Sequence, residues 1–200
     1  MKQLLIATNN KGKIIEIREI LSALNLDLVT PAEIGLTLEV QEDGLNYAEN
    51  AAKKALAFAQ ASGLPALADD SGLEVDALDG RPGLHSNRFG LQPSTEASRR
   101  RYLLEQLQHF PRPWTARFRA TIAVALPEGE VIFATGVCEG EIIPEERGQG
   151  GFGYDPLFWL PELGKTMAEL SLDEKNRLSH RGRALQNILP KLRDVFGERA

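Results

Sequence analysis

Two adjacent carboxylates in the middle of the chain are the first candidates for chemistry. The apolar run 64–68 leads directly into Asp69, Asp70, Ser71 and Gly72. Such a run is typical of a buried strand, and α/β proteins bind ligands beyond the carboxyl ends of such strands. Because side chains alternate along a strand, we expect Asp69 and Asp70 to point to opposite faces, one into a cleft and one into a structural network. A strand that runs into an Asx turn explains the same residues.

A polar segment near the N-terminus is a second candidate. A strand is predicted over Gln3–Ala7 and a helix over Ile14–Leu24, and the segment between them is Thr8, Asn9, Asn10, Lys11, Gly12 and Lys13. Free backbone N–H groups at a helix start, together with lysines, can bind a phosphate. The Walker pattern GxxxxGK[ST] is absent. A helix start capped by asparagine, with solvated lysines, is the alternative.

Acidic residues precede the next predicted helix, Leu45–Ala61. Glu39, Glu42 and Asp43 either interact with the helix dipole or contribute to a metal site. Within the helix, small apolar residues form one stripe that can pack closely on a sheet. Asn50 and Lys54 lie on the opposite side, where they face either water or a cleft. Glu49 and Lys53 are spaced for an i,i+4 ion pair.

The densest glycine stretch, 148–156, contains Phe152, Gly153, Tyr154 and Asp155. Glycines allow a backbone to approach a ligand closely, and an aromatic residue in such a loop can stack on a nucleobase. A tight turn before the apolar strand 157–160 is the alternative.

Two helix starts follow. Ser171 to Glu174 is a capping-box pattern opening a short helix that carries Lys175. His180 and Arg181 fall in the first turn of the last helix, which continues to about Leu192. Positive charge is unfavourable there, so these residues indicate an anion that offsets it.

The remaining elements are predicted from period and composition. Arg99, Arg100 and Arg101 are expected on a solvated face. The predicted elements are strands at Asp27–Thr30, Leu73–Leu78, Ala116–Ala125 and Val131–Ile143, an irregular loop at Gly80–Gly90 and a helix at Ser94–Gln108.

Composition limits the class of protein. The chain has 200 residues, 42% hydrophobic content and a net charge of −5, which suit a globular protein of one domain, with or without two lobes. We expect no nucleic-acid or membrane partner, because the chain has no overall positive charge. A single cysteine, Cys138, allows no intrachain disulfide, and neither a signal peptide nor a membrane span is expected. These features favour the cytoplasm.

Five motifs in order give the chain a specific resemblance. Together they resemble the Ham1/RdgB family of inosine/xanthosine triphosphate pyrophosphatases, from Leu4 to about Leu192. The motifs are Thr8 to Lys13, Glu49 to Ala55, Ala68 to Leu73, Gly151 to Pro156 and Ser179 to Gly182.

The resemblance implies an α/β fold with a bent mixed β-sheet and flanking helices in two lobes, a single catalytic domain over 1–200 with the active-site cleft between the lobes, and a homodimer. It implies Mg²⁺-dependent cleavage of the α–β phosphoanhydride of ITP, dITP or XTP, which keeps these nucleotides out of DNA and RNA. Asp70 is then the catalytic proton acceptor and a metal ligand, and Glu42 is the second metal ligand. The substrate contacts implied are Thr8, Asn9, Asn10, Lys11, Gly12, Lys13, Lys54, Ser71, Phe152, Gly153, Tyr154, Asp155, Lys175, His180 and Arg181.

The residue types agree with that chemistry. Carboxylates and phosphate oxygens suit Mg²⁺, and no His/Cys cluster suggests zinc. Phe152 would stack on the purine, and donors from His180 or Arg181 to a 6-oxo group would disfavour adenine. Guanine also carries a 6-oxo group, so the exclusion of GTP requires a further contact that these residues do not provide.

Some positions depart from the family pattern, and other classes remain as alternatives. Asn87 stands where the family commonly has a small residue, which leaves the role of the loop 85–89 open, and Asn9 and Lys11 fill variable positions. A Maf-like pyrophosphatase would carry Ser and then Pro-Arg-Arg near its N-terminus, and this chain does not. A nucleotide- or RNA-binding regulatory module is disfavoured by the acidic charge and by the Asp70/Glu42 pair. Serine-nucleophile chemistry is disfavoured because no GxSxG motif exists.

Overall fold

The computed structural model describes residues 2–90 and 93–197. Among these residues the strands form one seven-stranded mixed sheet in the order β2-β1-β3-β4-β5-β6-β7. The strands are β1 (Lys2–Ile6), β2 (Leu26–Val29), β3 (Ala66–Val75), β4 (Trp114–Ala125), β5 (Val131–Ile142), β6 (Phe158–Leu160) and β7 (Lys165–Thr166). The predicted α/β class with a mixed sheet is confirmed.

The described residues also form five α-helices and three short 3-10 turns. The α-helices are α1 (Lys11–Leu21), α2 (Tyr47–Ser62), α3 (Glu96–Leu107), α4 (Leu172–Leu178) and α5 (His180–Phe196). The 3-10 turns are η1 (Asp76–Leu78), η2 (Gly83–Arg88) and η3 (Met167–Glu169). The loop predicted at 80–90 therefore contains a helical turn.

Strand direction changes across the sheet. β1 pairs in parallel with β2, with Leu4 opposite Leu28, and with β3, with Leu5 opposite Ala66. β5 and β6 are antiparallel, and so are β6 and β7. The parallel strands lie at the N-terminus, where helices connect them. Short turns join β4 to β5 and β6 to β7, and the longer loop 143–157 joins β5 to β6.

The chain divides into two compact units. Unit 1 comprises 1–70, 120–136 and 180–200, and unit 2 comprises 71–119 and 137–179. The long strands β3, β4 and β5 each run from one unit into the other.

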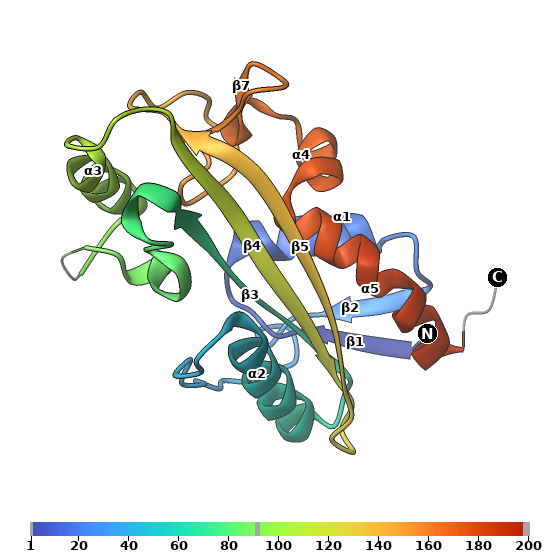
Figure 1. Cartoon of the computed structure of the whole chain (residues 1–200). Coiled ribbons are helices and arrows are strands. Elements are labelled where there is room, and N and C mark those ends of the chain that lie inside the picture. Colours follow the sequence, from blue (N-terminus) through green and yellow to red (C-terminus); the bar gives the residue numbers. More distant parts are fainter. Residues whose placement is uncertain (1, 91–92, 198–200) are drawn as a thin grey trace. The chain divides into compact units, whose positions relative to one another are not determined.

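Unit 1 buries apolar side chains on both faces of its strands. On one face α1 and α5 lie side by side (Figure 1) and pack on Leu4, Ile6 and Leu67. On the other face α2 presents Ala51, Ala55 and Ala59 to Leu5 and Ala68. Of the residues predicted to form the stripe, Ala55, Leu56 and Ala59 belong to this core, whereas Ala48 and Ala52 are half-buried and Leu45 is exposed. The prediction is therefore correct only in part, and the buried face also includes Ala51.

Unit 2 has its own core. Leu103 and Leu107 of α3 pack in one cluster with Leu73, Trp114 and Phe158. The rings of Phe118 and Phe158 lie 4.5 Å apart between centroids. This core supports the loop 143–157, which carries the predicted base-binding residues.

β3 corrects one prediction. Asp69, Asp70, Ser71 and Gly72 lie inside one continuous ten-residue strand and do not form a turn between two strands. Burial and pairing on both sides of β3 stabilise extended backbone despite the turn-forming residue types, because strand preference depends strongly on context.

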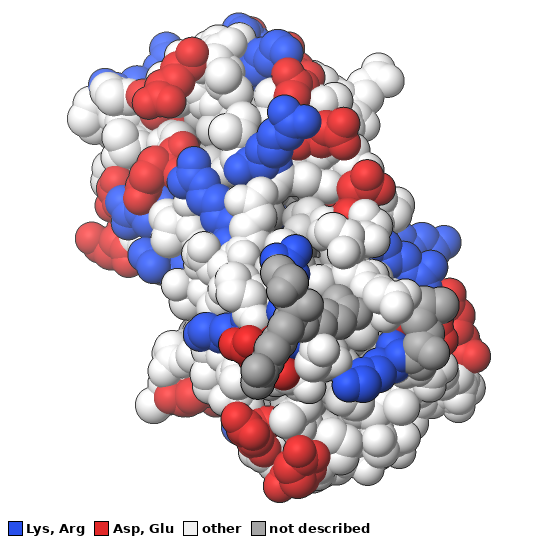
Figure 2. Space-filling model, turned by 90° about the vertical axis from the view of Figure 1, so that its right-hand side faces the viewer, with Lys and Arg blue, Asp and Glu red and all other residues white. Residues whose placement is uncertain are grey.

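Lysine and arginine side chains are interspersed with acidic ones on the face of the molecule in Figure 2. None of the described helices combines the length and the apolar character that crossing a bilayer requires.

Candidate functional site

The two aspartates of β3 point to opposite faces, as predicted. Asp69 lies with Leu67 on the face covered by α1 and α5, where it accepts hydrogen bonds from Lys13 Nζ at 2.5 Å and Arg181 Nε at 2.8 Å. Asp70 lies on the other face and is hydrogen-bonded by Asn50 of α2. Strand alternation alone therefore assigns the two carboxylates to different surroundings.

A buried ion-pair cluster forms around Asp69. Arg181 Nη1 also donates to Glu16 Oε2 at 2.7 Å, so that Lys13, Arg181, Asp69 and Glu16 are linked. All four are at most 7% exposed. Two cations and two carboxylates make the cluster neutral, which offsets the desolvation of each charge.

Charge compensation decides the ionisation of this cluster. Burial acts to raise the pKa of Asp69, but Arg181 and Lys13 outweigh it and hold that pKa well below its usual range. Burial acts to lower the pKa of Arg181, but Asp69 and Glu16 outweigh it and raise that pKa. Burial lowers the pKa of Lys13, and the neighbouring charges of Arg181 and Lys54 lower it further against the effect of Asp69. Lys13 thus lies where a further negative charge would be favourable.

The charged form of Asp70 is stabilised less by its neighbours than that of Asp69. Burial, with a further contribution from Glu42, raises its pKa to about 6 despite Lys13, Asn50 and Lys54. Within the described part of the chain, its buried Oδ2 atom has no hydrogen-bond partner. A buried acceptor without a donor is rare in proteins and points to a group that completes it.

The segment before α1 has the geometry of a capped helix start. Asn10 is the N-cap, and its Oδ1 accepts a hydrogen bond from the backbone N–H of Lys13 at 3.1 Å. Thr8 Oγ1 accepts from the N–H of Asn10 at 3.2 Å. Asn9 and Lys11 are exposed, Gly12 is half-buried, and only Lys13 points into the buried cluster.

The start of α2 brings Glu42 and Lys54 together as an ion pair. Asn50, only 2% exposed, accepts from the N–H of Gly44 at 2.7 Å and also hydrogen-bonds Asp70. Asn50 therefore links the segment 42–44 to β3. The predicted Glu49–Lys53 pair is wrong, because Lys53 pairs with Asp43.

Glu49 instead accepts hydrogen bonds from the backbone N–H of Leu45 and the side chain of Asn46. Glu42 and Asp43, which precede α2, likewise form specific ion pairs, with Lys54 and Lys53, in addition to any interaction with the helix dipole.

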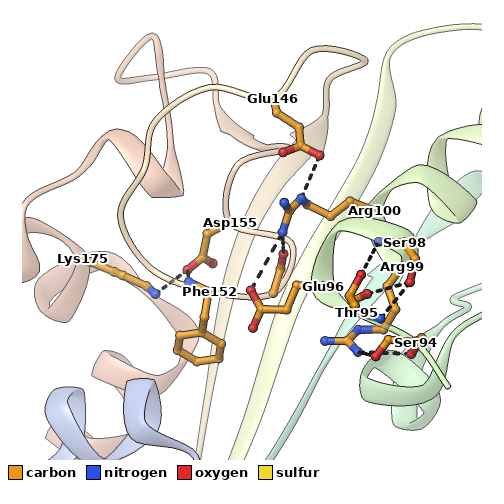
Figure 3. Close-up of polar contacts among 11 residues, drawn as sticks. Ser94, Thr95, Glu96, Ser98, Arg99, Arg100, Glu146, Phe152, Asp155 and Lys175 are labelled. Carbon is orange, nitrogen blue, oxygen red and sulfur yellow. Dashed lines mark hydrogen bonds and ion pairs between the residues drawn. The ribbon is translucent and has the colours of Figure 1, made fainter.

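A second polar cluster lies in unit 2, in the glycine-rich loop (Figure 3). Asp155 Oδ2 accepts from the backbone N–H of Phe152 at 2.9 Å and from Lys175 Nζ at 2.6 Å. The Lys175 ammonium lies 4.7 Å from the centroid of the Phe152 ring. A Cβ on Gly151 would lie 2.0 Å from Asp155 Oδ2, and its φ is +69°, so glycine is required there.

The same loop is attached to the segment 83–88 through Tyr154. Its hydroxyl donates to the carbonyl of Ser86 at 2.9 Å, and Ser86 Oγ accepts from the N–H of Leu73 at 2.8 Å. Burial raises the pKa of Tyr154, so the donor stays protonated at neutral pH. This contact gives a structural role to a loop whose role the sequence left open. Ser71 lies on β3 and is half-buried.

His180 and Arg181 begin α5 as predicted, and both are buried. A Cβ on Gly136 would lie 2.1 Å from the carbonyl oxygen of His180, so this glycine lets β5 approach the helix start. The anion expected near these cations is supplied at least in part within the chain, by Asp69 and Glu16 acting on Arg181.

Three contributions were missed at the sequence level. Glu16, Ser86 and Arg100 each support a predicted site residue. Glu16 is spaced i,i+3 from Lys13, which indicates a shared helix face, but periodicity does not show whether a polar face is buried. Arg100 was expected to be solvated, yet its side chain is 13% exposed.

The described residues contain no group of three or more His, Cys, Asp or Glu side chains placed to bind a metal. Glu42 and Asp70 remain the predicted carboxylate pair, because Glu42 contributes to the raised pKa of Asp70. A carboxylate whose pKa is raised by burial and by a neighbouring carboxylate favours a nearby cation.

The fold and these clusters define a mixed α/β protein with a buried carboxylate–lysine site on its central strands. The family model described as the Ham1 family matches residues 4–191. The protein named dITP/XTP pyrophosphatase in Desulforamulus reducens is 48% identical over 97% of both chains, and that of Thermus thermophilus is 47% identical over 96% of this chain and 92% of its own. The structure of a HAM1 protein from Coxiella burnetii superposes with a TM-score of 0.86 at 38% identity and full coverage of both chains. The chain belongs to the Ham1 family.

Proposed function

We propose that this chain is a nucleoside-triphosphate pyrophosphohydrolase that acts on dITP, ITP and XTP and releases pyrophosphate and the monophosphate. The proposal depends above all on the surroundings of Asp70. This carboxylate is buried, its pKa is raised to about 6, and its Oδ2 atom accepts no hydrogen bond from the described residues. It lies near Glu42, Lys13 and Lys54, the residue types that phosphoanhydride hydrolysis requires. Relatives at 48% and 47% identity carry the name dITP/XTP pyrophosphatase.

The residues around Asp70 fit a divalent cation, and we assign Mg²⁺. Asp70 Oδ2 and the Glu42 carboxylate would hold it. Two protein carboxylates are sufficient, because Mg²⁺ commonly completes its coordination with water and substrate phosphates. When bound, the cation supplies charge stabilisation to the phosphate oxygens.

We assign the triphosphate to the segment before α1 and to two lysines. Thr8, Asn9, Asn10, Lys11 and Gly12 present backbone N–H groups and polar side chains at the start of α1. Burial and neighbouring cations lower the pKa of Lys13, so a bound anion would stabilise its charged form. Lys54 can exchange its ion pair with Glu42 for a phosphate contact.

Asp70 accepts the proton of the attacking water. The water oxygen bonds to the α-phosphorus, the bond from that phosphorus to the bridging oxygen breaks, and pyrophosphate leaves with the bonding electrons. Lys13 and Lys54 stabilise the negative charge that develops on the phosphates. Asn50 holds Asp70 in place through its hydrogen bond.

The purine is assigned to the second cluster and the start of α5. Phe152 stacks on the base, and Lys175 and Asp155 hold the loop that carries it. Gly153, Tyr154 and Ser71 complete the proposed substrate contacts. His180 or Arg181 is the proposed donor to the 6-oxo group, and the 6-amino group of adenine would leave that donor unpaired.

We further propose that residues 1–200 form one catalytic domain, that the protein acts as a homodimer, and that it functions in the cytoplasm. The family resemblance supports the dimer, and the single buried cysteine suits a reducing compartment. Sedimentation of the purified protein tests the dimer directly.

The test of the activity is a substrate panel with Mg²⁺. We expect rapid release of pyrophosphate from dITP, ITP and XTP and at least about 100-fold lower kcat/KM for ATP and GTP, a difference of about 2.7 kcal/mol. Chelation should abolish turnover. Equal turnover of all five nucleotides, or orthophosphate as the first product, would overturn the proposal.

A further inference from the structure

Arg100 of α3 holds the loop that carries Phe152 at two points (Figure 3). Its Nη1 donates to the carbonyl of Gly153 at 2.9 Å, and its Nε donates to Glu146 Oε1 at 2.9 Å. Glu96, one turn earlier on the same helix, lies 3.9 Å from Nη1. The Arg100 side chain is 13% exposed and the Glu146 side chain 45%, so the partly buried bond to Gly153 is better shielded from water than the exposed bond to Glu146.

The two bonds act on separate parts of the loop 143–157. Glu146 lies before the glycine stretch, and Gly153 directly follows Phe152. The base of the loop is closed independently, because the N–H of Arg147 donates to the carbonyl of Pro156 at 2.9 Å and Tyr154 is attached to Ser86.

Phe152 itself is held on both sides. Its N–H is bound by Asp155, and the carbonyl of the next residue is bound by Arg100. Gly153 has a φ of +64°, a conformation that allows the chain to turn sharply after Phe152. The Arg100 bond therefore restricts the backbone immediately after the residue whose ring orientation matters.

We infer that Arg100 is a positioning residue for nucleobase binding, acting through the loop backbone that orients Phe152. This inference rests on the proposed function, in which Phe152 stacks on the purine. A guanidinium can bind a carbonyl and a carboxylate at once in one plane, whereas a lysine ammonium lacks that fixed fork. Arg100 pre-organises the loop, so the base does not have to order it on binding.

The matched variants are Arg100→Ala and Arg101→Ala. Both remove one arginine from α3, but Arg101 is exposed. For Arg100→Ala we expect the KM for dITP to rise about tenfold with kcat changed less than about threefold. Arg101→Ala should leave both constants within about twofold. Arg100→Lys should recover only part of the loss, because it restores the charge without the two-point geometry.

A second measurement separates positioning from general loss of structure. Inorganic tripolyphosphate lacks a base, so its inhibition constant should stay within about twofold in Arg100→Ala. Inosine monophosphate carries the base, and its dissociation constant, measured by calorimetry, should rise about tenfold. The midpoint of thermal unfolding should fall by no more than a few degrees.

The outcomes are distinguishable. An unchanged KM and an unchanged dissociation constant for inosine monophosphate would overturn the role of Arg100. So would equal losses for inosine monophosphate and tripolyphosphate, because these would show a structural role only. If wild-type protein does not release pyrophosphate from dITP, the proposed function fails, and the monophosphate titration still decides whether Arg100 positions a base-binding loop.

Discussion

Asp69 and Asp70 are neighbours in sequence, yet different residues determine their ionisation. Two buried cations stabilise the charge of Asp69, whereas Asp70 is buried with an acceptor atom that no donor in the described chain satisfies. Substitution by asparagine should therefore affect different properties at the two positions. At Asp70 it should affect the reaction, and at Asp69 it should affect the stability of the folded state.

Asp70→Asn should lower kcat by roughly 10²- to 10⁴-fold, the range typical of losing a general base. The fold should be retained, because asparagine has nearly the same shape and removes a desolvated carboxyl group. Steady-state release of pyrophosphate and circular dichroism would measure the two effects. Asp43→Asn is the control, because Asp43 is an exposed carboxylate paired with Lys53. A kcat for Asp70→Asn equal to that of the control would show that Asp70 is not the base.

Asp69→Asn should lower the free energy of unfolding by about 3–5 kcal/mol, because it leaves Lys13 and Arg181 buried with insufficient negative charge. Urea denaturation at neutral pH would measure the loss. Asp27→Asn removes a half-buried surface carboxylate that accepts from Gln3 and should change stability by no more than about 0.5 kcal/mol. Equal effects of the two substitutions would contradict a stabilising role for the buried cluster.

At this scale the sequence predicted the division between Asp69 and Asp70, because strand alternation is a local property. It did not predict Glu16 or Arg100. Both lie on polar faces of helices, and whether a polar face contacts water or another part of the protein depends on tertiary packing. The arginine run was expected to be solvated for the same reason.

At the scale of elements, most helix and strand positions agree with the sequence to within a few residues. β3 is the exception, since Asp, Ser and Gly indicate a turn while pairing with its neighbours keeps the strand extended. Local propensity could not reveal this, because the stabilising partners are distant in the sequence.

Glu33 joins two elements through a surface contact whose pH dependence can be predicted. It accepts from Arg18 of α1 and from Thr30 after β2, and these bonds lower its pKa to about 2. Because the folded pKa is below the ordinary value of 4.5, its contribution is present above pH 4.5 and is lost as the pH falls towards 2.

Glu33→Gln should therefore lower the urea midpoint slightly at pH 7, by less than Asp69→Asn, because the pair is exposed. The difference from wild type should narrow between pH 4.5 and pH 3. Glu19→Gln, at an exposed position on α1, should show no comparable narrowing. If the difference in urea midpoint between wild type and Glu33→Gln grew on acidification, the lowered pKa of Glu33 would be contradicted.

At the scale of the whole molecule, continuity between the two units is the main feature. β3, β4 and β5 each contribute residues to both units. Unfolding of one unit would interrupt three strands of the other, so we expect both to unfold together even though each has its own core.

The two tryptophans provide a test, since Trp114 and Trp159 both belong to unit 2. Their fluorescence should report unfolding of unit 2, and far-UV circular dichroism should report the helices of both units. In urea the two signals should give one coincident transition, as expected for a cooperative domain. Two separated midpoints would show that the units unfold independently and would contradict a single domain.

The position of Asp70 on a central strand also bears on how this protein could change over evolution. The proposed hydrolytic residue belongs to the rigid framework, whereas Phe152 and Asp155 lie on a glycine-rich loop and Lys175 on a short helix. Loops accept substitution and insertion more readily than central strands. New base preferences could therefore arise by exchanging residues around that loop while the hydrolytic apparatus is inherited unchanged.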